Sequence, residues 1–307
     1  MRGIKLFLIT FILAITSFSM TGCWYEEPVE SNIPKFEVII AYDRFGEYIE
    51  KSKDYKGDMD ILYKEIIYDP IYKAFISGGE YSNLAKGYIG GTIRQIDDME
   101  YKLKLLKKEK VEEIVEDALK KSNDLLNGVD TTVYIFPNTS EYNYLTKDLG
   151  GVVGVTAGSG KILLLIDPLN EQWKTILNYT VAHEYHHSVW SSRKYEFEGS
   201  ILANLVFEGK ADSFANKVFP DIEVPWVSSI DPGTERSVWN PIKNQLSSDD
   251  PELLQKLMFG GGDFPRWSGY TIGYHIVQDF LKNNSDYSIE EWTKLSSTEL
   301  LNKSGYK

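Results

Sequence analysis

The sequence is poor in cysteine, histidine and positive charge. Its 307 residues include one cysteine, Cys23, and four histidines. A single cysteine excludes an intrachain disulfide and a zinc site built from several thiolates. The 33 Lys and Arg are outnumbered by 45 Asp and Glu, which gives a formal net charge of −12. Because an acidic chain repels phosphate backbones, nucleic acid is not an expected partner.

An apolar run occupies residues 6–19, behind the basic residues Arg2 and Lys5. It is shorter than the roughly 20 residues that a membrane-spanning helix needs. Met20-Thr21-Gly22 then precede Cys23 and resemble the lipobox of bacterial lipoproteins, although Leu is commoner than Met at the first position. The resemblance implies cleavage after Gly22, acylation of Cys23 by a diacylglycerol thioether and palmitate-like chains, and anchoring at the outer face of the cell membrane. An ordinary signal peptide or a short anchor is the alternative.

Three of the four histidines fall in the stretch His183-Glu184-Tyr185-His186-His187, which contains the pattern H-E-x-x-H. On a helix, His183 and His187 lie one turn apart on the same face. Two imidazoles placed in this way bind one Zn²⁺, and Glu184 reaches a water that the ion activates. We therefore expect one zinc ion per chain. His186 is either a substitute ligand or a neighbouring polar residue of the cleft.

A catalytic zinc takes three protein ligands and keeps one position for water. Arg193 stands where one class of zinc peptidase has its third histidine, so the sequence excludes that class. Residues 200–219 predict a second helix, on which Glu208 follows His187 by 21 residues. Glu208 is therefore the expected third ligand. Glu196 and Glu198, in the connecting turn, are the competing candidates.

The pattern Glu208-Gly209-x-x-Asp212 resembles the second motif of the gluzincin metallopeptidases. The resemblance implies that Glu208 binds zinc and that Asp212 orients a ligand histidine from the second shell of the site, with His186 as a further neighbour. It also implies that Gly209 allows close approach to the metal-binding helix. With the late Gly-Tyr-x-x-Gly-Tyr pattern, the chain resembles the YjaZ-like family of predicted Zn-dependent proteases over residues 130–285.

Peptide hydrolysis at zinc develops negative charge on the carbonyl oxygen, and a Tyr or His donor usually helps to stabilise it. Tyr270, Tyr274 and His275 follow the second helix and are the candidates for this role. They lie in an apolar, helical stretch, so the alternative is that they are residues of the core.

The predicted fold is α+β, a zincin-like catalytic domain in which a small mixed sheet precedes the metal-binding helix and the second ligand helix. Gly158-Ser159-Gly160 predicts a hairpin between the last two strands. Leu163-Leu164-Leu165 belongs either to a sheet edge that binds substrate as an added strand or to a buried core strand. Strands are expected at residues 36–42, 132–136, 151–156 and 161–166. Helices are expected at 45–76 with a break at Asp69-Pro70, 97–126, 171–190, 200–219 and 250–260, and a last helix that ends at about Leu281.

The expected organisation has four parts. Residues 1–22 form the signal peptide, 23–35 a tether with two prolines, 36–128 a mostly helical N-terminal region, and 129–307 the zincin-like region. The last two parts form either separate units or one domain. Residues 220–268, rich in Pro, Gly and Trp, form a lid or wall of the site.

These patterns predict a zinc metallopeptidase that hydrolyses a peptide or protein substrate at the cell surface. Zinc lowers the pKa of a water, and Glu184 takes its proton and passes it to the leaving amine. The alternative is a non-catalytic lipoprotein that binds zinc or peptides, with His186 or His275 as a fourth ligand. A weaker alternative is an adhesion module that uses its aromatic surface.

Overall fold

The computed structural model describes residues 33–89, 91–138 and 146–307. The expected signal peptide, Cys23 and most of the expected tether lie outside the described residues. Residues from Pro34 to Lys307 form one compact unit, and its mixture of helices and strands makes the fold α+β. Within the part of the chain that is described, no helix is both long and apolar enough to cross a bilayer.

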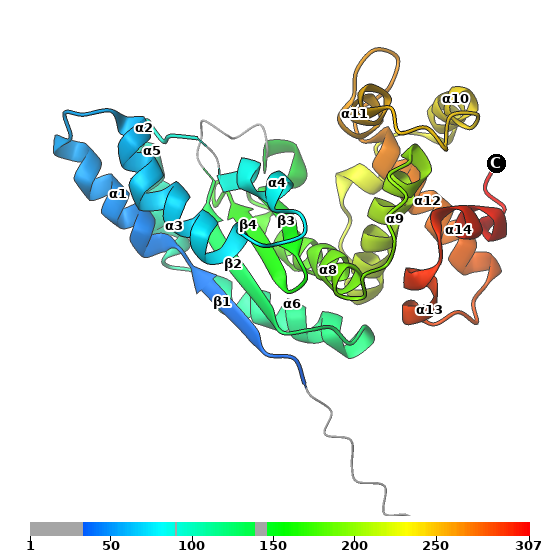
Figure 1. Cartoon of the computed structure of the whole chain (residues 1–307), viewed down its shortest axis with the longest axis horizontal. Helices are drawn as coiled ribbons and strands as arrows, with labels where there is room; N and C mark the ends of the chain where they lie inside the picture. The colour runs from blue at the N-terminus through cyan, green and yellow to red at the C-terminus, as the bar shows by residue number, and fades with distance from the viewer. Residues whose placement is uncertain (1–32, 90, 139–145) are drawn as a thin grey trace, which may run out of the picture. The chain divides into compact units, whose positions relative to one another are not determined.

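A four-stranded mixed sheet lies at the centre of the unit (Figure 1), with strands in the order β1-β2-β4-β3. Parallel pairs join β1 to β2 and β2 to β4, whereas β3 runs antiparallel to β4. Gly158 and Gly160 have positive φ angles and close the predicted β3–β4 hairpin. The strands are β1 (Phe36–Ile40), β2 (Thr131–Pro137), β3 (Val152–Gly158) and β4 (Lys161–Ile166).

Strand β4 is an interior strand, because both of its edges are paired. Leu163, Leu164 and Leu165 are buried there, which confirms a core strand and rules out the sheet edge as their location. The sheet edge beside the helix that carries His183 and His187 is β3 instead. The apolar sequence of β4 is typical of a strand buried on both faces, and its position in the sheet depends on the crossover from β2.

Helices cover both faces of the sheet. On one face, Phe136 stacks on Phe45 of α1 and Tyr134 packs on Phe75 of the π-helical turn η2. Helices α6 (Val111–Leu125) and α8 (Trp173–Ser192) pack on the other face, where Phe36 meets Tyr185 edge to face. The helical elements before β2 are α1 (Tyr42–Asp54), α2 (Met59–Tyr63), η1 (Lys64–Tyr68), α3 (Asp69–Ile71), η2 (Tyr72–Ile76), α4 (Ser82–Ala85), η3 (Lys86–Ile89), α5 (Ile96–Leu106) and α6 (Val111–Leu125).

Two predicted helix boundaries in this region are wrong. The chain stays helical through Asp69-Pro70, where the π-helical turns η1 and η2 lie directly before and after α3. The break comes earlier, at residues 55–58. The expected long helix at 97–126 is two helices, α5 and α6, since the chain turns at residues 107–110 and the two helices pack against different partners.

Three long helices follow the sheet and carry the predicted site. They are α8 (Trp173–Ser192), α9 (Ile201–Val218), whose N-cap is Ser200, and α12 (Ser268–Asn283). Helix α9 packs on α8 and on α12. A Cβ on Gly209 would come within 2.1 Å of the Gly273 carbonyl oxygen. The expectation that Gly209 faces the metal-binding helix is therefore wrong, because it serves the close approach of α9 to α12.

Four of the remaining elements, α10, α11, α14 and η6, pack on α12. Asp250 caps α11 through the N–H groups of Glu252 and Leu253, as the Asp-Pro signal predicts. The short helices after α12 are not expected from the sequence. The bounds of the remaining elements, before and after α12, are η5 (Lys147–Leu149), η6 (Pro225–Ser228), α10 (Pro232–Ile242), α11 (Pro251–Phe259), α13 (Ile289–Lys294) and α14 (Ser297–Ser304).

Candidate metal centre

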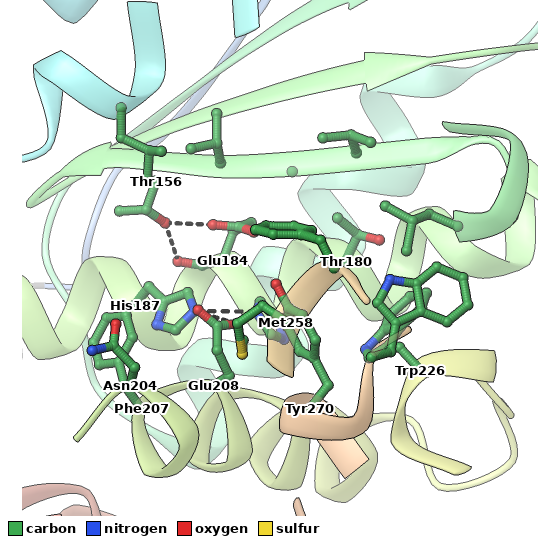
Figure 2. Close-up of a pocket in the computed structure, with 18 of the residues that line it drawn as sticks. Thr156, Thr180, Glu184, His187, Asn204, Phe207, Glu208, Trp226, Met258 and Tyr270 are labelled. Carbon is green, nitrogen blue, oxygen red and sulfur yellow. Dashed lines mark hydrogen bonds and ion pairs between the residues drawn. The ribbon is translucent and has the colours of Figure 1, made fainter. Parts of the chain in front are cut away.

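His183 and His187 of α8 and Glu208 of α9 converge at one point of the structure. Figure 2 labels His187 and Glu208 at this point. The two Nε2 atoms lie 3.1 Å apart. Glu208 Oε2 is 3.3 Å from His183 Nε2 and 3.6 Å from His187 Nε2. Helices α8 and α9 pack side by side. The two histidines of α8 therefore lie next to Glu208 of α9, and all three candidate ligands come from helices.

The spacing of these three atoms fits a zinc ion. A tetrahedral zinc with bonds of about 2.0–2.2 Å holds its ligand atoms roughly 3.3–3.6 Å apart, close to the distances observed. The donor types also fit, since two imidazoles and one carboxylate are a usual catalytic set. His183 donates from Nδ1 to Asp212 Oδ1 across 3.0 Å, which leaves its Nε2 lone pair directed at the cluster.

Asp212 accepts hydrogen bonds from several residues of the site. Its Oδ1 accepts from His183, from the Trp226 indole at 2.9 Å and from the Tyr179 hydroxyl at 3.3 Å. Asp212 is fully buried. The resemblance implies its bond to a ligand histidine, but Trp226 and Tyr179 are not expected from the sequence. Trp226 lies in η6, so the segment 220–268 reaches the metal site through this carboxylate.

The charges around the cluster favour a cation. Burial by itself would lower the pKa of His183, but Asp212 and Glu208 outweigh it and raise that pKa well above its usual value. Burial would raise the pKa of Glu208, yet His187 and His183 hold it well below its usual value. The two shifts reflect the same pairings, because each carboxylate and the imidazole beside it stabilise each other's charged form. Positive charge is therefore favoured between the buried carboxylate of Asp212 and the partly exposed carboxylate of Glu208. A divalent ion supplies that charge.

Glu184 lies beside the cluster, held by the edge strand β3. Thr156 Oγ1 is 2.8 Å from Glu184 Oε2 and 2.9 Å from the Glu184 carbonyl oxygen. Gly154 allows this approach, because a Cβ there would come within 2.5 Å of Glu184 Cγ. The sequence pattern identifies Glu184. It does not identify Thr156, because Thr156 reaches Glu184 only when β3 packs against α8.

The three predicted oxyanion donors have different locations. Tyr270 lines the cleft, and burial together with Glu208 raises its pKa well above the usual value, so it keeps its proton. Tyr274 is not among the cleft-lining residues, and its ring packs on His275. His275 Nδ1 is 2.9 Å from Glu235 Oε1, away from the cleft lining. Tyr270 is therefore the candidate that the structure brings to the site.

His186 points away from the metal cluster. It is fully buried and stacks on Trp292 with ring centroids 5.7 Å apart. Its Nε2 lies 3.1 Å from Thr293 Oγ1, and the Lys210 ammonium donates to the Thr293 carbonyl oxygen at 2.9 Å. His186 and Lys210 thus join the two metal-site helices to α13, a contact between residues more than 80 positions apart.

The competing carboxylates lie outside the cluster. Glu198 accepts from the Ser297 hydroxyl at 2.7 Å, and Glu196 is exposed in the connection between α8 and α9. Phe207, which no sequence pattern identifies, stacks on His187 with ring centroids 4.1 Å apart. Its ring covers one face of that imidazole, whereas His183 is held by a carboxylate.

A cleft of about 730 Å³ opens onto the cluster. The residues that line it come from β3, α8 and α9, from α4 and η3, and from α11 and Trp267. Cavities of roughly 300–1,000 Å³ are the usual size of ligand sites. The cluster, the nearby Glu184 and the Tyr270 hydroxyl thus share one accessible space.

Comparison with known proteins shows the family of the chain. The chain is 26% identical over 239 residues to the Uncharacterized protein YjfC of Bacillus subtilis (strain 168), covering 71% of this chain and 78% of that protein. No solved structure matches. Residues 111–302, which include α8, α9 and α12, match the family described as Predicted Zn-dependent protease (DUF2268). The chain belongs to this family of predicted Zn-dependent proteases.

Proposed function

We propose that the protein is a zinc metallopeptidase of the gluzincin type, with a zincin-like catalytic domain and one zinc ion per chain. The observation that carries this proposal is the convergence of His183, His187 and Glu208 within 4.8 Å of one another, with Glu184 on the same helix. The resemblance to predicted Zn-dependent proteases supports the same chemistry. The substrate is a peptide or protein.

Each residue of the site has a separate role in the proposed reaction. His183, His187 and Glu208 hold the zinc, which when bound polarises a peptide carbonyl and lowers the pKa of a water. Asp212 fixes the orientation of His183. Glu184, positioned by Thr156, takes a proton from the attacking water and delivers it to the leaving amine. Tyr270 donates its hydroxyl hydrogen to the developing oxyanion.

A purely binding role receives less support from the side-chain positions. Zinc-binding sites without catalytic activity are usually closed by a fourth protein ligand. The two candidates for that ligand, His186 and His275, contact Thr293 and Glu235 instead. Among the described residues, the cluster therefore offers three ligands and leaves room for water and substrate.

Metal analysis together with peptide hydrolysis tests the proposal. We expect the purified chain to contain one zinc per molecule and to cleave casein or members of a peptide library. A chelator should abolish cleavage, and added zinc should restore it, because the ligands persist without the ion. Cleavage that survives complete removal of zinc, or a chain that never binds zinc, would refute the proposed function.

We further propose that the enzyme is anchored at the outer face of the cell membrane by a lipid on Cys23. The lipobox-like Met20-Thr21-Gly22-Cys23 supports this location. We expect radiolabelled palmitate to label the wild-type chain. The Cys23→Ser variant should carry no label and should no longer be found in the membrane fraction of the cells. Labelling of Cys23→Ser equal to the wild type would refute the anchor.

A further inference from the structure

The walls of the cleft are apolar on both sides of the metal cluster. Leu84 of α4 and Tyr88 of η3 form one wall, and Leu254, Met258 and Phe259 of α11 form the other. Leu84 and Phe259 are each 57% exposed, although both are large and apolar. Exposed apolar side chains gathered around a cleft indicate a surface that a partner covers. Here that surface continues directly from the site of chemistry.

Charged substrate groups find no counter-charge on these walls. Apart from the residues of the metal centre, Arg266 is the charged residue among the described cleft-lining residues. Its guanidinium pairs with Asp148 and lies 4.5 Å from the Trp267 ring centroid, so its charge is already compensated. A charged side chain entering between the walls would lose its hydration without gaining a partner, which is unfavourable.

The edge of β3 offers backbone groups to an extended peptide. Asp167 N donates to Gly151 O, and Val153 and Val155 pair with Leu165 and Leu163. Because groups alternate along a strand, Val152 and Gly154 direct their N–H and C=O groups away from β4.

The two outward-facing residues of this stretch differ in exposure, because Gly154 is partly exposed whereas Val152 is buried. The next neighbour, Tyr81, donates to Ala157 O at 3.0 Å, beyond the stretch, and we find no described residue hydrogen-bonded to the outward groups of Val152 or Gly154. Gly154 itself lies against Glu184. A strand added at this edge therefore passes the catalytic carboxylate and places alternate side chains toward the walls.

We propose that the cleft selects an extended peptide with a bulky aliphatic or aromatic side chain, which lies between Leu84 and Tyr88 on one side and α11 on the other. The proposal rests on the proposed function and adds the substrate class. The wall formed by α4 and η3 precedes residue 111, where the family match begins. The preference is therefore set partly by a segment outside that match.

Binding and cleavage of matched peptides test this inference. A set of fluorescent peptides differs at one central position, which is Leu, Phe, Asp or Lys. Fluorescence anisotropy on the zinc-loaded Glu184→Gln chain measures affinity without turnover, and mass spectrometry on the wild-type chain measures cleavage. We expect the Leu and Phe peptides to bind at least about tenfold more tightly than the Asp and Lys peptides.

Variants of the exposed walls extend the test without disturbing the core. In Leu84→Lys and Phe259→Lys, made in the Glu184→Gln chain, we expect affinity for the Leu peptide to fall and affinity for the Asp peptide to rise, reversing the preference. Leu125→Lys is the matched control, because Leu125 is 44% exposed and does not line the cleft. A merely structural effect would weaken all four peptides equally.

The outcomes separate this inference from the proposed function. Apolar-selective binding without cleavage of any peptide would support the subsite and refute the peptidase. Cleavage with no preference among the four side chains, or wall variants identical to the Leu125→Lys control, would refute the subsite and leave the peptidase intact. A chain that neither binds nor cleaves any peptide would overturn both.

Discussion

Replacing Glu184 with Gln should lower the turnover of peptide hydrolysis by about 10²–10⁴-fold, the usual contribution of a general acid–base residue. Glutamine has almost the same shape and can still accept the Thr156 hydroxyl, which lies 2.8 Å from Oε2 in the wild type. It cannot take a proton from water. The variant should therefore keep the geometry of the site and lose the proton transfer.

Zinc content should not change in Glu184→Gln, because the ligand atoms come from His183, His187 and Glu208. Metal analysis and steady-state kinetics on the same preparation measure both quantities. Glu171→Gln is the matched control, since Glu171 is exposed just before α8 and should leave both quantities at wild-type values. Hydrolysis retained in Glu184→Gln would show that another group transfers the proton.

Replacing Glu208 with Ala should remove zinc and activity together. The change leaves two imidazoles, and a two-ligand site does not hold a catalytic zinc well. It also removes a partly exposed carboxylate that helps to raise the pKa of His183. We expect the zinc content to fall from one per chain to a small fraction after dialysis, and hydrolysis to fall to background.

Glu196→Ala is the control for this experiment, because Glu196 is the competing ligand candidate and is exposed away from the cluster. It should keep one zinc and full activity. Far-UV circular dichroism of both variants checks that each chain is folded. If Glu196→Ala lost the metal and Glu208→Ala retained it, the assignment of the third ligand would be wrong.

The local parts of this site follow directly from the sequence. His183 and His187 share a helix face because a spacing of four residues is one turn, whatever surrounds the helix. Glu208 and Asp212 are related in the same way on α9, and Ser200 caps that helix as its position predicts. The β3–β4 hairpin is equally local, since Gly158 and Gly160 supply the positive φ angles.

Predictions that depended on a partner distant in the chain were less successful. The apolar sequence of β4, with Leu163, Leu164 and Leu165, does not show whether β4 lies at the edge or in the interior of the sheet. A buried strand has the same composition in both positions. Gly209 was expected to face α8, yet its contact is Gly273 of α12. Both outcomes depend on which surfaces meet when helices and strands pack.

By itself, the sequence determined the candidate ligands: a pair of histidines that helical geometry places on one face, a neighbouring carboxylate, and a later glutamate on a second helix. Only the tertiary structure decided the residues that complete the site. Thr156 and Gly154 reach Glu184 from β3, and Trp226 reaches Asp212 from η6. The physical reason is range, since helix periodicity acts over a few residues, whereas these contacts require the folding of segments far apart in the chain.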